Sequence, residues 1–227
     1  MSHEWYLHAD QRVVWRSISS PFAALVRRFP LLLWLAVAWP GQLLAQVPGV
    51  YHVDAKNSCI QIILYHGGLL GALTDNHLVV LHRFSGVAEL SQASSWHLEM
   101  QGQAASLKVE DPGSSEADRK EVQEMMDGPE QLDVIRHPLI KLQSLSFQPT
   151  QQDTIWSLLA DVTLHGVTRQ EEFPLDCQQT GDRLRVRGEK MLLLRDFNIK
   201  PISRVFGAIK VDNGFKVTYE IVLERDH

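Results

Sequence analysis

The segment Thr154–Cys177, TIWSLLADVTLHGVTRQEEFPLDC, constrains the fold more than any other part of this chain. Apolar side chains recur at every second position from Trp156 to Leu164, and Leu159 interrupts the polar series. After His165-Gly166, one face carries Val167, Phe173, Leu175 and Cys177. A period of two residues is typical of a β-strand with one buried and one solvated face. Gly166 can adopt the positive φ that a tight hairpin turn requires. The segment therefore predicts two antiparallel strands that are joined at His165-Gly166.

Comparable alternation recurs along the rest of residues 46–227. Further strands are expected, in chain order, at Val50–Val53, Cys59–Tyr65, Leu78–Leu90, Trp96–Gln101, Leu139–Phe147, Arg183–Leu194 and Phe215–Leu223. Ser85-Gly86 is expected to break the third of these, because glycine inside a strand is typical of a bulge or a sharp bend. Asp212-Asn213-Gly214 predicts a turn before the last strand.

A single helix is expected over Ser114–Asp127. Ser115 and Asp118 form a Ser-x-x-Asp pattern that satisfies free backbone N–H groups at a helix start, and Gly128-Pro129 ends the helix. Its apolar stripe, which we expect to cover one end of the domain, consists of Val122, Met125 and Met126. About eight short strands, one helix and no internal repeat predict an all-β, antiparallel eight-stranded barrel, with a sandwich as the alternative.

Residues 1–45 have the order of a secretory signal peptide. Arg27-Arg28 precedes an uncharged run of eleven apolar residues, Phe29–Trp39, and Ala45 offers a small residue at the cleavage position. An uncleaved membrane anchor is the alternative, although this run is shorter than the about 20 residues that a spanning helix needs. We therefore expect export to the periplasm or secretion. The mature protein would be a single domain over residues 46–227, without a stable membrane span.

Charge and motif content exclude several classes of function. The formal net charge is −5, and removal of residues 1–45 takes away four arginines and two acidic residues, which leaves −7. An acidic chain without a basic patch lacks the electrostatic footprint of a nucleic-acid-binding protein. The chain also lacks the G-x-S-x-G, H-E-x-x-H, Walker and G-x-G-x-x-G patterns. We therefore expect a protein that is not an enzyme and holds no cofactor.

Two cysteines, Cys59 and Cys177, lie within the expected mature domain. An oxidising compartment would allow them to form a disulfide. Cys177 shares a strand face with Phe173 and Leu175, so a buried free thiol is the alternative. The sequence leaves both states open.

Three ordered motifs resemble one known family. VTLHGVTR at Val162–Arg169 is similar to the L-T-I/L-H-G-V-T-R/K motif of the YceI-like family. GEKMLLLRDFNIKPISRVFGAIKV at Gly188–Val211 resembles its G-E…D-F-G-I…G-A-I-K-V segment, and Tyr51–Asp54 followed by Ser58 resembles its opening. The resemblance implies a secreted bacterial protein with a lipocalin-like barrel that binds a polyisoprenoid lipid, such as a quinone or a polyprenyl lipid. A homodimer is left open.

An eight-stranded barrel is wide enough either to be filled by its own side chains or to hold one small ligand. Alternation alone favours a packed core, which would make the protein a non-binding structural or interaction domain. The family resemblance instead implies a lining occupied by an isoprenoid chain. The inward-facing residues that we expect to form this lining are Leu158, Val162, Leu164, Phe173, Leu175, Leu192, Leu194, Val217, Tyr219 and Ile221.

A metal- or redox-linked accessory role is a further alternative. The stretch Leu70–Val80 resembles a G-H-D/N-H-V segment found in one branch of the family, but it has Thr74 and Asp75 at the positions of the glycine and the first histidine. Asp75, His77 and His82 could supply a carboxylate and two imidazoles, which is a known ligand set for transition metals. Loop and surface polar residues are the alternative interpretation of this segment.

Overall fold

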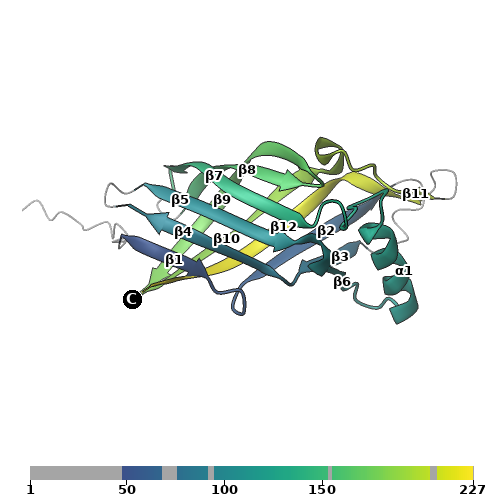
Figure 1. Cartoon of the computed structure of the whole chain (residues 1–227), viewed down its shortest axis with the longest axis horizontal. Coiled ribbons are helices and arrows are strands. Elements are labelled where there is room, and N and C mark those ends of the chain that lie inside the picture. Colours follow the sequence, from purple (N-terminus) through teal and green to yellow (C-terminus); the bar gives the residue numbers. More distant parts are fainter. Residues whose placement is uncertain (1–47, 68–75, 92–94, 153–154, 205–208, 227) are drawn as a thin grey trace, which may run out of the picture. The chain divides into compact units, whose positions relative to one another are not determined.

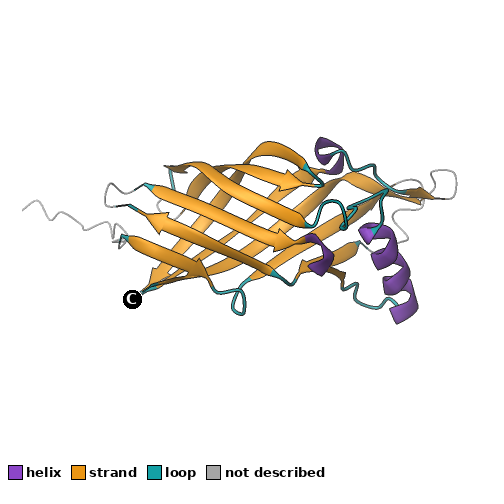
Figure 2. Cartoon of the chain, in the orientation of Figure 1, coloured by secondary structure: helices purple, strands orange, loops and turns teal. Residues whose placement is uncertain are grey.

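The computed structural model describes residues 48–67, 76–91, 95–152, 155–204 and 209–226, all within a compact unit that spans Gln42–His227. These residues form strands together with one α-helix and two short 3₁₀ helices (Figure 2). The first six strands are β1 (Gly49–Val53), β2 (Cys59–Gly67), β3 (His77–Leu81), β4 (Phe84–Leu90), β5 (Trp96–Gln103) and β6 (Leu107–Val109). The others are β7 (Leu139–Pro149), β8 (Ile155–Leu164), β9 (Val167–Thr180), β10 (Arg183–Leu193), β11 (Ser203–Arg204) and β12 (Ile209–Arg225). The helices are η2 (Ala104–Ser106), α1 (Glu116–Asp127) and η3 (Leu194–Phe197).

The strands form one closed antiparallel barrel. Hydrogen-bonded neighbours follow the order β1-β4-β5-β7-β8-β9-β10-β12, and β12 then pairs with β1 to complete the ring (Figure 1). This ring of eight strands confirms the predicted eight-stranded antiparallel barrel.

Three positions in the ring are occupied by two successive strands. The chain bends between β1 and β2, between β3 and β4, and between β5 and β6, so that each pair continues one barrel strand in two pieces. β12 accordingly pairs with β1 near its end and with β2 along its earlier part. These bends account for three of the four strands beyond the eight ring positions, and the fourth is the short β11, which pairs with β12.

The β8–β9 hairpin lies where the alternation predicts it. The strands pair from Leu164↔Val167 to Ile155↔Asp176, and the two residues between them are His165 and Gly166. Both have positive φ, 50° and 72°, which matches the twist of a tight hairpin. A Cβ on Gly166 would lie 2.7 Å from the His137 ring, so glycine also makes room for a neighbouring loop.

Two expected interruptions differ in the structure. The strand predicted over Leu78–Leu90 breaks at His82-Arg83, whereas Gly86 lies inside β4. A Cβ on Gly86 would lie 2.7 Å from the Met100 side chain and 2.8 Å from a backbone oxygen, so this glycine serves close strand packing. The turn predicted at Asp212-Asn213-Gly214 is instead a bulge within β12, where the register with β2 shifts. The strand continues because β2 pairs with β12 on both sides of the bulge, at Val211 and at Phe215.

A gap in the strand pairing lies between β6 and β7. Among the described strands, β6 pairs with β3 at one edge, and β7 pairs with β5 and β8. Helix α1 packs against β6 at this gap (Figure 1). Gln123 of α1 accepts a hydrogen bond from the Val109 N–H at 3.0 Å and donates one to the Leu107 carbonyl at 2.9 Å. One side-chain amide therefore replaces a neighbouring strand at the edge of β6.

The helix begins and ends as its sequence predicts. Ser115 is the N-cap, and its hydroxyl accepts a hydrogen bond from the Asp118 N–H. Gly128 is the C-cap. Val122 and Met126 pack against an apolar cluster on β3 and β6, yet no residue of the helix is fully buried. The helix is therefore held mainly by one apolar stripe and by the Gln123 amide.

The N-terminal segment predicted as a signal peptide, residues 1–45, lies outside the described residues. Among the residues that are described, no helix has both the length and the apolar character needed to cross a bilayer.

Candidate functional site

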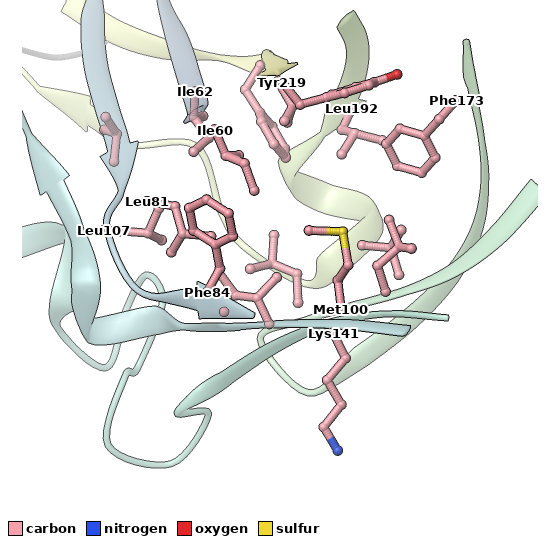
Figure 3. Close-up of a pocket in the computed structure, with 18 of the residues that line it drawn as sticks. Ile60, Ile62, Leu81, Phe84, Met100, Leu107, Lys141, Phe173, Leu192 and Tyr219 are labelled. Atoms are coloured by element: carbon pink, nitrogen blue, oxygen red, sulfur yellow. The ribbon is translucent and has the colours of Figure 1, made fainter. Parts of the chain in front are cut away.

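The barrel encloses a cavity of about 590 Å³. This volume falls within the range of roughly 300–1,000 Å³ that is typical of small-molecule sites. Figure 3 shows Ile60, Ile62, Phe84 and Met100 directed toward one common space, while the amine of Lys141 points away from it. The cavity therefore has an apolar wall, and Lys141 contributes only its aliphatic stem.

All ten side chains that the sequence predicts to face inward lie on the wall of this cavity. Six of them come from β8, β9 and β10: Leu158, Val162, Leu164, Phe173, Leu175 and Leu192. The other four, from η3 and β12, are Leu194, Val217, Tyr219 and Ile221. Their contact with a ligand stays a prediction. The position of the nine strand residues at the cavity follows from strand alternation, whereas Leu194 lies at the start of η3.

The sequence-based list missed one half of the wall. β2 to β5 contribute Ile60, Ile62, Leu64, Val79, Leu81, Phe84, Trp96, Leu98 and Met100. Trp96, Leu98 and Met100 alternate clearly in the sequence and could have been included on that ground. β2 is apolar at both parities, so its inward face was harder to assign. Helix α1 adds Val122, Met125 and Met126, as its apolar stripe indicated.

Tyr219 and Gly188 form a close contact across the cavity wall. The two residues are register partners on β12 and β10. The Tyr219 hydroxyl donates a hydrogen bond to the carbonyl of Pro174, and its ring meets Phe173 edge to face at 6.1 Å. A Cβ on Gly188 would collide with the Tyr219 hydroxyl and with the Pro174 carbonyl. Burial raises the pKa of Tyr219, so this phenol remains a neutral hydrogen-bond donor in the wall.

The two cysteines are free thiols in different surroundings. Cys177 is buried and lines the cavity, whereas Cys59 is exposed. Burial, with a smaller contribution from the neighbouring Asp176 carboxylate, raises the pKa of Cys177 to about 12. Cys177 therefore acts as a small apolar residue of the wall. This state corresponds to the buried free thiol, one of the two alternatives that the sequence left open.

The two ends of the cavity differ in polarity. The end away from α1 is lined by aromatic and aliphatic residues, and Trp96 packs there on the buried Tyr51 with ring centroids 5.4 Å apart. At the α1 end, polar side chains enter the lining from the end of β2, the start of β3, the helix and the segment after it. They are His66, His77, Asp118, Glu121 and Gln131. The cavity therefore has an apolar interior and one polar mouth.

His77 is the most firmly positioned of these polar residues. Its Nδ1 lies 2.6 Å from Oδ2 of Asp111, and its side chain is 20% exposed. The Asp111 carboxylate is only 6% exposed and also accepts the Leu78 N–H at 2.6 Å. His66 meets the His77 ring edge to face, with centroids 4.5 Å apart. The His77 ring is therefore held at the mouth by two neighbours, the Asp111 carboxylate and the His66 ring.

The structure does not bring the two histidines of the metal hypothesis together. His77 lines the cavity, whereas His82, after the end of β3, is half exposed and contacts Glu110 at 2.7 Å. Asp75 lies outside the described residues. Within the part of the chain that the structure covers, no three His, Cys, Asp or Glu side chains gather at metal-binding distance.

A closed antiparallel ring around an apolar cavity with one polar mouth defines a lipocalin-like β-barrel. Within that class, the chain belongs to the family of the YceI-like domain, whose family model matches residues 51–223. This match confirms the family that the three sequence motifs indicate.

Solved structures with the same fold have low sequence identity to this chain. BcnA from Burkholderia cenocepacia is 16% identical with a TM-score of 0.60, over 75% of this chain and 98% of that one. A polyisoprenoid binding domain from Saccharophagus degradans, described as implicated in plant cell wall breakdown, is 12% identical with a TM-score of 0.56, over 79% and 100%. A YceI protein from Campylobacter jejuni is 10% identical with a TM-score of 0.53, over 66% and 85%. No match to this chain was found among the curated proteins.

Proposed function

We propose that this protein binds an amphiphilic isoprenoid lipid inside the barrel and carries it in the periplasm. The observation that supports this proposal most directly is the cavity of about 590 Å³ with an apolar interior. A structural relative described as a polyisoprenoid binding domain supports the same ligand class. A quinone or a polyprenyl lipid would fit, because both combine a long branched hydrocarbon chain with a small polar head.

Burial of the hydrocarbon chain would supply the affinity. Each CH₂ group removed from water is worth about 0.8 kcal/mol, so an isoprene unit of five carbons is worth about 4 kcal/mol before costs. Ordering a flexible chain and losing translational freedom offset part of this gain. Several isoprene units would still bind without a charged clamp. The mechanism is reversible burial, in which no covalent bond is made or broken.

In this proposal, the difference in polarity between the two ends of the cavity determines the orientation of the bound lipid. The hydrocarbon tail would lie toward Trp96 and Trp156, where the wall is aromatic and aliphatic. The head group would lie at the α1 end, because a polar group buried without hydrogen bonds is costly. Met125 and Met126 of α1 line this mouth, and their flexible side chains suit a ligand that enters and leaves.

The first test is native mass spectrometry of the protein purified from its own periplasm, followed by organic extraction. A co-purifying species with isoprene mass spacing would support the proposal and identify the ligand. The second test is a series of isoprenoid alcohols with two, three and four isoprene units. Kd is expected to fall by more than tenfold per unit while the added unit still enters the cavity.

A cavity-filling variant provides the control. Val162→Trp places a large side chain in the lining, whereas Leu145→Trp makes the same change at a position that is 47% exposed on β7. The proposal expects Val162→Trp to weaken binding of the longest alcohol and Leu145→Trp to leave it unchanged. Equal affinity of both folded variants would place the ligand outside the barrel.

Export is part of this proposal and has its own test. The order Arg27-Arg28, apolar run and Ala45 supports cleavage before Gln46. N-terminal sequencing of the protein from a periplasmic fraction should return a chain that begins at or near Gln46. Recovery of a chain that retains Phe29–Trp39, in the membrane fraction, would favour the anchored alternative.

A further inference from the structure

The contact between His77 and Asp111 determines which nitrogen of the imidazole carries its proton. An ionised carboxylate only accepts hydrogen bonds, and Asp111 lies 2.6 Å from Nδ1. Nδ1 is therefore the donor, and in the neutral ring Nε2 carries the lone pair. Asp111 is itself fixed by the Leu78 N–H at 2.6 Å. The start of β3 thus presents an oriented hydrogen-bond acceptor.

The surroundings of His77 at the mouth add further acceptors. Asp118 and Glu121 project from α1 into the same lining, and Gln131 follows from the segment after the helix. Carboxylates accept hydrogen bonds, and an amide both accepts and donates them. A ligand group that donates a hydrogen bond would therefore be matched here better than one that only accepts.

We propose that this mouth is a head-group subsite in which Nε2 of His77 accepts a hydrogen bond from a hydroxyl group of the ligand. This inference rests on the proposed function, because it assumes that an isoprenoid tail occupies the cavity. The ligand class is then a hydroxyl-bearing isoprenoid, and isoprenoid alcohols and the reduced, hydroquinone form of a prenyl quinone share this chemistry. An isoprenoid ether or an oxidised quinone, which only accepts hydrogen bonds, would bind less tightly.

His82 offers a matched control on the same segment of chain. It follows β3 directly, and its imidazole contacts a carboxylate, Glu110, at 2.7 Å. The His82 and Glu110 side chains are 50% and 45% exposed, and neither lines the cavity. The two histidine–carboxylate pairs thus have the same chemistry, but only the His77 pair faces the cavity.

The experiment compares two ligands with the same tail, geranylgeraniol and geranylgeranyl methyl ether, at pH 8. Kd for each is measured with the wild-type protein and with His77→Phe and His82→Phe. The ratio of the ether Kd to the alcohol Kd is expected to fall about fivefold in His77→Phe, the value of one hydrogen bond. It is expected to remain unchanged in His82→Phe. Comparing ratios between variants cancels the difference in hydrophobicity between the two ligands.

The outcomes separate this inference from the function on which it rests. If the wild-type protein binds neither ligand, the proposed function fails and the subsite with it. If it binds both but the ratio is the same in His77→Phe, the subsite inference is overturned while the lipid-binding function stands. An equal fall of the ratio in His82→Phe would also overturn it.

A second measurement keeps the inference testable if His77→Phe does not fold, since that change leaves the Asp111 carboxylate buried without its imidazole partner. In wild-type protein labelled with ¹⁵N-histidine, the alcohol should shift the Nε2 resonance of His77 and the ether should not. The same shift with both ligands would show that the hydroxyl group does not reach this nitrogen.

To decide between the two sources of the hydroxyl, the same titration is run with a reduced and an oxidised short-chain prenyl quinone. Tighter binding of the reduced form, lost in His77→Phe, would extend the subsite to hydroquinones. Equal binding of both forms would restrict it to alcohols.

Discussion

Replacing Gln123 by alanine tests how α1 is held against the barrel. The Gln123 amide makes two hydrogen bonds to the edge of β6, one with the Val109 N–H and one with the Leu107 carbonyl. It also donates to the Asp127 carboxylate at 2.9 Å. Alanine has the best intrinsic helix propensity, so the substitution should not weaken the helix itself. Its expected effect is therefore confined to the contact between α1 and β6.

The expected magnitude follows from the two hydrogen bonds to β6. Each contributes roughly 1 kcal/mol net, which gives about 2 kcal/mol for their loss. Since 1.4 kcal/mol corresponds to a factor of ten, about 2 kcal/mol corresponds to roughly 30-fold faster local opening. The Val109 amide should therefore exchange its proton roughly 30-fold faster in Gln123→Ala.

Native-state hydrogen exchange followed by NMR measures this rate directly. Glu124→Ala is the matched control, because Glu124 is the next residue of the helix, is 71% exposed and lies 3.9 Å from Lys120 in an exposed ion pair. Exposed ion pairs contribute little, so the control should leave the Val109 rate unchanged. Equal Val109 exchange rates in the two variants would refute the view that one amide holds α1 at the gap between β6 and β7.

Four further predictions concern the cavity wall, the two cysteines and one turn. Gly188→Ala should lower the free energy of unfolding by about 1–3 kcal/mol in urea titration, because its methyl group overlaps the Tyr219 hydroxyl; an unchanged midpoint would contradict this packing. In native protein at pH 8 a thiol reagent should label Cys59 and spare Cys177, whose pKa is raised to about 12; labelling of both would contradict the burial of Cys177. The Cys177 thiol loses its proton at lower pH in the unfolded chain than in the folded protein. The free energy of unfolding should therefore fall as pH rises from about 9 to 12, and the loss should reach about 2 kcal/mol at pH 10.5. Cys177→Ala should reduce this fall, and Tyr219 and Tyr51, whose pKa values burial also raises, contribute to the part that remains. Asn198 has φ 59°, so Asn198→Ala should cost about 1–2 kcal/mol and Asn198→Gly much less; an equal cost of both would contradict the left-handed conformation.

Strand alternation predicted the parts of the cavity that depend on local periodicity. In β8 to β10 and β12, alternate residues point to opposite faces of the sheet. Once the face of one residue is known, the inward-facing residues of the whole strand are therefore known as well. Leu158, Val162 and Leu164 therefore line the cavity as expected. Helix α1 was also predictable, because its cap at Ser115 and its end at Gly128 depend on neighbouring residues alone.

The features that the sequence did not predict depend on contacts between distant residues. Asp212-Asn213-Gly214 suits both a hairpin turn and a bulge, and the pairing of β12 with β10 and β2 decides for the bulge. The contact between His77 and Asp111 joins residues 34 positions apart, and the Gln123 amide reaches a strand edge that no local pattern reveals. The sequence therefore suggested His77 only as a metal ligand or as a polar surface residue, and not as part of a cavity mouth.

The order in which the chain closes the ring has a consequence for folding. β12 is the last strand, and its 17 residues pair with β1, β2 and β10, so Tyr51 meets Arg225 across almost the whole domain. Pairings between residues so far apart in sequence form slowly, because a long loop must close before they contribute. Until β12 is in place, the apolar wall remains exposed to water, and such intermediates are prone to aggregate. The C-terminal strand therefore controls both the completion of the barrel and the period during which the unfinished chain needs protection.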